Sequence, residues 1–337
     1  MVLGGRGGGI LCRPPITIIP VTARYIGRLA PSPTGLLHLG HVATFWAAHQ
    51  RAQQHNGTLL LRNEDLDSQR SRPEFVDAML EDLAWLGIAW QPPMLSQSTR
   101  LAAYRAAFQK LLATGLVYRC TCSRSDLASS LQAPHDDQEA EPIYSGRCRP
   151  QEPAPLADFA PGNYRFRVPD GEAIRFTDLN LGPQSFTALA APSPLMDSPH
   201  AFGDFIVWRK PASRRPLVNS PTNSGAPHLD CEMWDGSAGL PSYQLACVVD
   251  DAFQQITEVV RGADLLKSTA RQVLLQRALG YATPAYFHTR LLRDQHGVRL
   301  AKRHDALALR TLREQGLTPT QVLAHLPAQS GRSKVRA

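Results

Sequence analysis

The sequence predicts an α/β protein built on a doubly wound parallel sheet. Two short apolar segments, residues 25–29 and 58–62, are each followed by a turn and then by apolar positions at helical spacing. Strands that alternate with amphipathic helices form parallel sheets covered by helices, and such sheets bind ligands at the carboxyl ends of their strands. The 337 residues, 43% of them hydrophobic, suffice for a large core with additional lobes.

The first unit begins with the strand at residues 25–29 and turns at residues 31–35, where two prolines and a glycine interrupt the pattern. The next helix is predicted from side chains spaced three and four residues apart, namely Val42, Phe45, Trp46 and His49. The loop between this strand and this helix should therefore lie at the ligand-binding edge of the sheet.

The second unit begins with the strand at residues 58–62. Ser71 is predicted to cap the following helix, with Pro73 in the first turn and Glu74 completing a capping box, and the helix should end near Gly87. Regular patterns resume at residues 243–249 and 256–260, and a helix over residues 264–279 is predicted to end at Gly280.

Between these units the composition changes. Residues 117–240 hold three closely spaced cysteines, many prolines and glycines, and short strand-like runs such as residues 164–168, which is typical of an insertion into the sheet. Residues 211–230 are predicted to form a long loop. The predicted divisions are a disordered tail (1–23), the first half of a nucleotide-binding core (24–116), the insertion (117–240), the second half (241–290) and a C-terminal segment (291–337).

Charge and composition exclude several classes of protein. The net charge of +7 favours a polyanionic partner such as nucleic acid or nucleotide phosphates. No apolar run reaches the roughly 18 to 20 residues that span a bilayer, so we expect no membrane partner. Six unevenly spaced cysteines indicate a metal site in a reducing compartment rather than a disulfide framework. We therefore expect a cytoplasmic protein.

Two histidines lie where the first loop opens into a helix. The run from Arg28 to His41 reads Arg-Leu-Ala-Pro-Ser-Pro-Thr-Gly-Leu-Leu-His-Leu-Gly-His, so His38 and His41 stand three residues apart. A helix start offers free N–H groups and a positive dipole end to phosphate. His38 and His41 can add hydrogen bonds to a triphosphate, and Gly40 allows an adenine or a ribose to lie against the backbone.

This run resembles the first signature of class I aminoacyl-tRNA synthetases of the glutamyl branch. Further matches follow in the family's order, at residues 61–67, 243–251, 258–264 and 291–303. The resemblance covers residues 24 to 312. It implies a Rossmann-like catalytic core that binds ATP and L-glutamate, with Mg²⁺ accompanying the ATP.

The run Val298-Arg-Leu-Ala-Lys-Arg303 resembles the family's second signature, a lysine-rich loop that closes over ATP. The resemblance gives Lys302 the role of stabilising charge on the phosphates as pyrophosphate leaves, which suits a compact ammonium group. Arg299 stands where the family usually has a lysine and keeps its charge. Ala301 stands where it usually has serine and loses a hydroxyl. The alternative is a solvated basic turn.

The resemblance also implies a pocket for a small dicarboxylate. It assigns Arg28 to the side-chain carboxylate of glutamate, Glu64 to its ammonium group, and Tyr243 and Arg261 to the remaining polar contacts. An arginine pairs a carboxylate through two N–H groups, and a buried carboxylate suits an ammonium. The full predicted glutamate site is Arg28, Leu29, Ala30, Pro31, Ser32, Glu64, Tyr243 and Arg261.

Two features leave the pocket open to other interpretations. Cys247 stands where we expect asparagine in ordinary glutamyl-tRNA synthetases, so one contact differs. Arg28 and Glu64 could also simply pair with each other.

Cys120, Cys122 and Cys148 offer three thiols to a metal that takes four ligands. The short members of the glutamyl-like family use a Cys-x-Cys and Tyr-x-x-x-Cys set, which by resemblance makes Tyr144 the fourth ligand of a structural Zn²⁺. His135 is the rival, because phenolate is an unusual zinc ligand. The alternative is a group of core cysteines without metal.

Only residues 303–337 follow Lys302, which is too few for the anticodon-binding region of ordinary glutamyl-tRNA synthetases. The chain therefore most resembles the family's short paralogues, the glutamyl-queuosine tRNA(Asp) synthetases. These attach glutamate to the queuosine base at the wobble position of tRNA(Asp), and we expect a monomer that does so. The alternatives are a truncated glutamyl-tRNA synthetase that charges a tRNA 3′ end and a non-catalytic RNA-binding paralogue.

Overall fold

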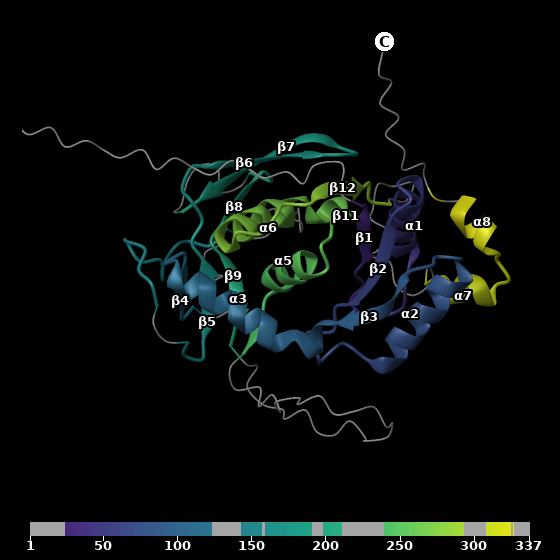
Figure 1. The fold of residues 1–337 in the computed structure, drawn as a ribbon, viewed down its shortest axis with the longest axis horizontal. Helices are drawn as coiled ribbons and strands as arrows, with labels where there is room; N and C mark the ends of the chain where they lie inside the picture. The colour runs from purple at the N-terminus through teal and green to yellow at the C-terminus, as the bar shows by residue number, and fades with distance from the viewer. Residues whose placement is uncertain are drawn as a thin grey trace, which may run out of the picture.

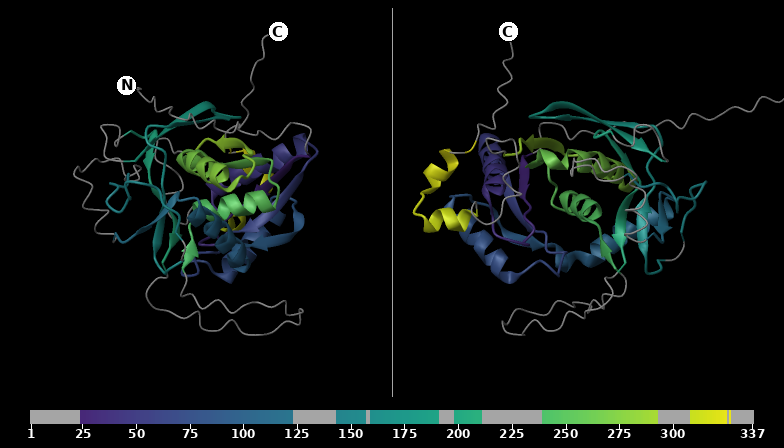
Figure 2. Two further views of the ribbon diagram at one scale, coloured as in Figure 1. Left: turned by 60° about the vertical axis from the view of Figure 1, so that its left-hand side comes forward. Right: turned by 180° about the vertical axis from the view of Figure 1, so that it is seen from behind.

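The protein is described by a computed structural model, shown in Figures 1 and 2. The described residues are 24–122, 143–156, 159–190, 198–210, 239–292, 308–324 and 326. The predictions made for the tail, for His135, for residues 211–230 and for Lys302 fall outside this part of the chain.

The first half of the sheet holds three parallel strands in the order β1-β2-β3. They are β1 (Ile26–Leu29), β2 (Thr58–Asn63) and β3 (Gln91–Ser96), and their connections run through α1 (Leu39–Gln54) and α2 (Pro73–Trp85). Apolar side chains of α1, β1 and β2 pack into one core, with Leu61 and Val42 fully buried. The predicted strand-helix units are present with nearly the expected bounds.

The second half contributes two more parallel strands, β11 (Glu258–Gly262) and β12 (Ala285–Thr289), joined by α6 (Leu266–Leu279). As predicted, α6 ends at Gly280, whose positive φ of 70° favours glycine. The helix α5 (Tyr243–Phe253) precedes β11.

The two halves meet where β1 lies beside β11. Thr257, just before β11, donates its backbone N–H to the carbonyl oxygen of Ile26 at 2.9 Å. The Arg28 side chain reaches the carbonyl oxygen of Val260 at 2.9 Å. The carboxyl ends of the parallel strands of both halves therefore lie at one edge, and the predicted α/β class with a parallel sheet is confirmed.

The residues predicted to form an insertion build two β-sheet regions, one antiparallel and one mixed. One is a four-stranded sheet in the order β10-β9-β5-β4, which follows α3 (Leu101–Ala113). Its strands are β4 (Val117–Cys120), β5 (Asn163–Phe166), β9 (Phe205–Arg209) and β10 (Leu240–Pro241). In Figure 1 this sheet lies on the far side of α5 and α6 from β1.

The other region has mixed strand directions and extends the parallel sheet itself. The strands β6 (Ala173–Asp178), β7 (Gly182–Leu189) and β8 (Ala201–Gly203) continue the order β11-β12-β6-β7-β8. Asp178, at the end of β6, stands opposite Tyr286 of β12 in parallel register. The sequence did not predict this pairing, because the two strands come from distant parts of the chain.

Two short helices near the C-terminus, α7 (Leu309–Glu314) and α8 (Pro319–Ala324), lie beside α1 and α2 (Figures 1 and 2). Arg313 of α7 donates to the buried carboxylate of Asp82 on α2 at 2.7 Å. In addition, the backbone N–H of Leu309 donates to the carbonyl oxygen of Leu37 at 2.7 Å. The C-terminal segment is thus attached directly to the start of α1.

The predicted cap of α2 is wrong. The N-cap residue is Arg72, and the hydroxyl of Ser71 is buried without a hydrogen-bond partner among the described residues. A reciprocal capping box forms instead at α1, between His38 and His41. Among the described residues no helix is both long and apolar enough to cross a membrane.

Candidate active site

A cavity of about 610 Å³ opens at the carboxyl ends of β1, β2, β11 and β12. Most of the predicted site residues in the described part of the chain line it: Arg28, Ala30, Pro31, Ser32, His38, Gly40, His41, Glu64, Tyr243 and Arg261. Leu29 does not, because its side chain is buried in the core beneath the sheet edge. Two groups of residues predicted from separate motifs are therefore brought together in one pocket.

The two histidines hold each other and the helix start in place. The Nδ1 atom of His38 accepts the backbone N–H of Gly40 at 3.1 Å, and the Nδ1 atom of His41 accepts the backbone N–H of His38 at 3.3 Å. Their rings are stacked with centroids 3.8 Å apart. Since each Nδ1 accepts a hydrogen bond, each neutral ring carries its proton on Nε2.

Both histidines are neutral near pH 7. Burial lowers the pKa of His38, and burial together with the neighbouring His38 lowers the pKa of His41 to about 3. The pair therefore offers Nε2–H donors at a helix start without adding a positive charge. Such donors can form hydrogen bonds to phosphate oxygens alongside the free N–H groups of the first turn.

Gly40 is required by the His38 ring as well as by any ligand. A Cβ atom at this position would lie 2.9 Å from Cε1 and 3.0 Å from Nδ1 of His38. A larger residue would push the ring out of its capping position. The geometry thus adds a second reason for glycine to the close ligand approach predicted from the sequence.

Arg28 and Glu64 do not pair with each other. The Arg28 Nε atom lies 3.4 Å from Asp251 Oδ1, whereas Glu64 Oε1 accepts hydrogen bonds from Arg62 at 3.1 Å and 3.3 Å. All of these side chains are less than a tenth exposed. The alternative in which Arg28 and Glu64 neutralise each other is therefore contradicted.

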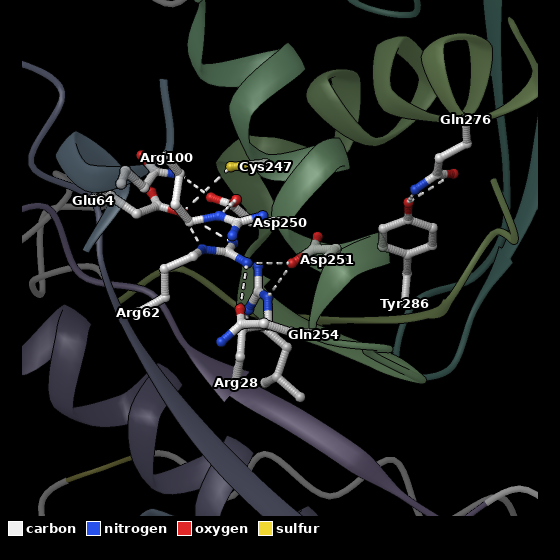
Figure 3. Close-up of polar contacts among 12 residues, drawn as sticks. Arg28, Arg62, Glu64, Arg100, Cys247, Asp250, Asp251, Gln254, Gln276 and Tyr286 are labelled. Carbon is white, nitrogen blue, oxygen red and sulfur yellow. Dashed lines mark hydrogen bonds and ion pairs between the residues drawn. The ribbon is translucent and has the colours of Figure 1, made fainter. Parts of the chain in front are cut away.

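Arg62 is the centre of this network and was missed by the sequence analysis. Its side chain is fully buried, and Nη1 donates to Asp251 Oδ1 at 2.7 Å and to Gln254 at 3.1 Å (Figure 3). Its Nη2 atom donates to Glu64. A charged residue inside the apolar run of β2 was the available signal, because a buried arginine needs carboxylate partners.

Asp250 and Asp251 are neighbours on α5 with different tasks. Asp251 contacts Arg28 and Arg62, and these arginines keep the pKa of its carboxyl low although burial opposes this. Asp250 faces α3, where it accepts hydrogen bonds from Tyr104 and Arg100 at 2.7 Å each. The helix α5 thus joins the pocket to the neighbouring core (Figure 3).

Cys247 lies one turn before Asp251 and is fully buried. Its thiol donates to Glu64 Oε1 at 3.3 Å. Burial and the neighbouring Glu64 raise the thiol pKa, so the sulfur stays protonated and neutral. The thiol therefore takes a weak donor role toward Glu64.

Arg261 and Tyr243 complete the same end of the cavity. Arg261 donates from Nη2 to Thr269 at 2.6 Å and from Nε to His288 at 3.3 Å. Its Nη1 atom is buried and has no hydrogen-bond partner within the described ranges. Burial raises the pKa of Tyr243, so its phenol is neutral. The cavity thus ends in two arginines, a carboxylate and a phenol.

A second cluster lies away from this cavity, between β4 and the chain before β5. The sulfur atoms of Cys120, Cys122 and Cys148 lie within 4.8 Å of one another, and the closest pair is 3.5 Å apart. The Tyr144 hydroxyl is 3.5 Å from Cys122 Sγ and 3.7 Å from Cys120 Sγ. Ligands about 2.3 Å from a tetrahedral Zn²⁺ would be separated by about 3.8 Å, so this donor set fits zinc.

Arg165 supports this interpretation of the cluster. Its Nε atom donates to Cys120 Sγ at 3.3 Å, and its guanidinium stacks on the Tyr144 ring at 3.8 Å. The positive charge of Arg165 complements the negative charge that three thiolate ligands would bring to a Zn²⁺ site. His135 lies outside the described residues, so Tyr144 is the predicted fourth ligand that the structure places beside the thiols.

The second signature, with Arg299, Ala301 and Lys302, also lies outside the described residues. The chain resumes beside the histidines, because Ala308 forms a bridge with His38 in the backbone. The C-terminal neighbour of the predicted ATP loop is thus fixed to the N-cap of α1.

Solved structures share this fold. A glutamate tRNA ligase from Elizabethkingia meningosepticum, solved in complex with its amino acid, has a TM-score of 0.61 at 24% identity over 88% of this chain. The glutamate-tRNA synthetase from Elizabethkingia anophelis has a TM-score of 0.62 at the same identity and coverage. This chain spans 54% of each of those two chains. At this identity the likeness supports the fold alone.

Curated relatives are more similar, over most of their length. The Glutamyl-Q tRNA(Asp) synthetase of Symbiobacterium thermophilum is 41% identical over 317 residues, which cover 90% of this chain and 86% of the relative. Proteins of the same name from Geobacter sulfurreducens (41% identity, 84% and 77% coverage) and Rhodobacter capsulatus (37% identity, 88% and 98% coverage) are also similar.

The model of the catalytic domain of class I tRNA synthetases specific for E and Q matches residues 25–189 and 220–330. With its parallel sheet, its capped histidine pair and these relatives, the chain belongs to the class I tRNA synthetase family of the E and Q type.

Proposed function

We propose that this protein activates L-glutamate with ATP and transfers the glutamyl group to the queuosine base at the wobble position of tRNA(Asp). The observation that supports the activation step is the cavity, which is lined by Arg28, Glu64 and Arg261 at one end and by the neutral pair His38 and His41 at the other. The acceptor is supported by the names of relatives up to 41% identical over most of both chains.

The glutamate end of the cavity binds the amino acid by charge complementarity. Arg28 pairs the side-chain carboxylate of glutamate, Glu64 accepts hydrogen bonds from its ammonium group, and Arg261 makes a further polar contact. Tyr243 and the strand-end residues Ala30, Pro31 and Ser32 complete the pocket. The buried, unpartnered Nη1 of Arg261 supports this assignment, because leaving such a donor without an acceptor costs about 1 to 3 kcal/mol.

In the activation step an oxygen of the α-carboxylate of glutamate attacks the α-phosphorus of ATP. An O–P bond forms, the bond between the α- and β-phosphates breaks, and pyrophosphate leaves. His38 and His41 donate from Nε2 to phosphate oxygens, Gly40 lets the nucleoside approach, and Lys302 neutralises the leaving pyrophosphate. Mg²⁺ bound to the ATP phosphates supplies further charge neutralisation.

In the transfer step a hydroxyl of the queuosine base attacks the activated carbonyl carbon. An ester forms, and AMP leaves with the electron pair of the acyl–phosphate bond. The enzyme holds the two reactants together and provides no covalent nucleophile of its own. The same cavity therefore serves both steps.

The test of the activation step is glutamate-dependent exchange of pyrophosphate into ATP in the absence of tRNA. We expect exchange with glutamate and none with aspartate or glutamine. A non-catalytic RNA-binding protein would give no exchange with any amino acid.

The acceptor is tested by charging tRNA(Asp) with and without queuosine, each before and after periodate, which destroys free cis-diols. We expect labelling only on queuosine-containing tRNA(Asp) that has not been oxidised. Labelling that persists without queuosine, or that requires the 3′ end of tRNA(Glu), would contradict the proposed acceptor.

For the cysteine cluster we propose one structural Zn²⁺ held by Cys120, Cys122, Tyr144 and Cys148. Metal analysis of the protein purified from zinc-supplemented cells should give about one zinc per chain. Cys122→Ser should lose it, and Cys247→Ser, which changes a buried cysteine outside the cluster, should keep it. Equal metal content in both variants would contradict the site.

A further inference from the structure

Arg261 is held on one side by two hydrogen-bonded neighbours and left open on the other. Its guanidinium donates to Thr269 Oγ1 from Nη2 and to His288 Nε2 from Nε, while Nη1 stays without a partner and the residue lines the cavity. The side chain is only 4% exposed. The orientation of the guanidinium group therefore depends on the atoms that accept hydrogen bonds from Nε and Nη2.

The acceptor on His288 exists only in one tautomer. His288 Nδ1 lies 2.6 Å from Asp178 Oδ2, so this nitrogen carries the proton and donates to the carboxylate. Nε2 is then an acceptor, as the hydrogen bond from Arg261 requires. Burial lowers the pKa of His288, which keeps the ring neutral and keeps that acceptor available.

Asp178 is itself fixed in orientation. Its Oδ1 atom accepts the backbone N–H groups of Asn180 at 3.0 Å and Leu181 at 2.8 Å, which leaves Oδ2 for His288. Its carboxyl is buried, yet the hydrogen bonds from His288 and the backbone outweigh burial and lower its pKa. An ionised Asp178 cannot donate to the ring, so only one tautomer of His288 fits.

The three residues come from three neighbouring strands and are linked through their side chains. Arg261 on β11 stands opposite His288 on β12, and Asp178 ends β6 on the other side of β12. We propose that Asp178 and His288 are positioning residues that orient Arg261, so that its Nη1 is presented to a carboxylate of the bound substrate. This inference rests on the proposed glutamate site, and it assigns part of that site's affinity to residues with no contact with the ligand.

Two substitutions separate positioning from a purely structural role. His288→Asn retains an N–H where Nδ1 donates to Asp178 but removes the acceptor for Arg261. Asp178→Asn keeps an oxygen that accepts the backbone N–H groups of the turn. Its amide NH₂ group then faces His288 Nδ1, which must accept, so the ring proton moves to Nε2. There the proton faces the N–H of Arg261 Nε, and the hydrogen bond between the two residues is lost. Tyr286→Phe is the matched control. Tyr286 is on the same strand as His288, and the substitution removes its buried hydrogen bond to Gln276 of α6 (Figure 3).

Glutamate binding to the full chain is measured by calorimetry, with thermal unfolding followed in parallel. We expect His288→Asn and Asp178→Asn to weaken glutamate binding about tenfold, the effect of misplacing one charged hydrogen bond, and to leave the KM for ATP within twofold. Tyr286→Phe should lower the melting temperature while glutamate affinity stays unchanged.

The inference is overturned if both variants bind glutamate as the unaltered protein does, or if Tyr286→Phe weakens binding equally. It is also overturned if the unaltered protein does not bind glutamate. Binding without pyrophosphate exchange would contradict the proposed function alone, because calorimetry reports the pocket and the exchange assay reports the chemistry.

Discussion

The two ends of the cavity are built in opposite ways. At the phosphate end, His38 and His41 are neutral, half-buried and held by backbone N–H groups within one helix turn. At the amino-acid end, Arg28, Arg62 and Glu64 are charged, buried and held by side chains from distant strands and helices. Local folding organises the first end, and the packed core of the whole domain organises the second. Substitutions at the phosphate end should therefore affect the rate of activation, and substitutions at the amino-acid end should affect the stability of the fold.

The largest effect is expected for Arg62→Met, which leaves Glu64 and Asp251 buried without their shared partner. Breaking a buried ion pair from one side costs about 3 to 5 kcal/mol. Chemical denaturation measures this loss. Arg72→Met is the control, since Arg72 and Glu74 form an exposed pair at 3.7 Å, and it should change stability by less than about 1 kcal/mol. Equal losses of unfolding free energy in the two variants would contradict the view that the amino-acid end is stabilised by its buried ion pairs.

At the phosphate end, His38→Ala and His41→Ala should each lower the kcat of pyrophosphate exchange about 100-fold, the usual effect of removing one donor to developing charge. The unfolding free energy should fall by only about 1 kcal/mol, because one helix cap is weakened. His55→Ala, at the other end of α1, should leave the rate unchanged. A stability loss as large as that of Arg62→Met would show that this end too is part of the core.

Acid should reveal the neutral histidines. Because the pKa of His41 is about 3 in the folded protein and 6.5 in the unfolded one, the unfolded state takes up its proton first as the pH falls. The stability contributed by this group is complete above pH 6.5 and declines below it, by about 2 kcal/mol at pH 5. In His41→Gln, the difference in unfolding free energy between pH 7.5 and pH 5 should be smaller by that amount. An unchanged difference would mean that the folded ring is protonated.

The smallest effect is expected for Cys247→Ala at the amino-acid end. The thiol is a weak donor, and Glu64 keeps both of its hydrogen bonds from Arg62. We expect the KM for glutamate to change less than about threefold, because the lost contact contributes about 0.5 kcal/mol or less. A tenfold change in the KM for glutamate would contradict this expectation and show that Cys247 contributes substantially to glutamate binding.

The fold was predictable wherever the pattern is local. The strands and helices from residue 25 to α2, and the end of α6 at Gly280, follow from apolar spacing and glycine conformation. The Ser71 cap failed because Arg72 takes the N-cap position, while the histidine capping box at α1 has no common sequence signature. The pairing of β6 with β12 joins residues about a hundred positions apart, which periodicity does not reveal.

The candidate site divides in the same way. Most of the described residues grouped by the family signatures line one cavity, and the family and fold class predicted from them are confirmed. The individual roles stay predictions. Arg62, Asp178 and His288 could not be assigned from the sequence, because their partners lie on other strands and helices. A charged residue inside an apolar strand predicts that an oppositely charged partner exists, but the sequence does not identify that partner.

The parallel pairing of β6 with β12 limits how this enzyme can be re-engineered. An exchange of the whole segment from residue 117 to residue 240 with that of a relative would also exchange Asp178, and with it the acceptor state of His288. A chimera that is to preserve the acceptor state of His288 should therefore keep the strand that ends at Asp178 and replace only the antiparallel sheet around β4, β5 and β9. The segment thus contains one strand that is linked to the cavity through His288 and Arg261, and a separate sheet of which no described residue lines the cavity.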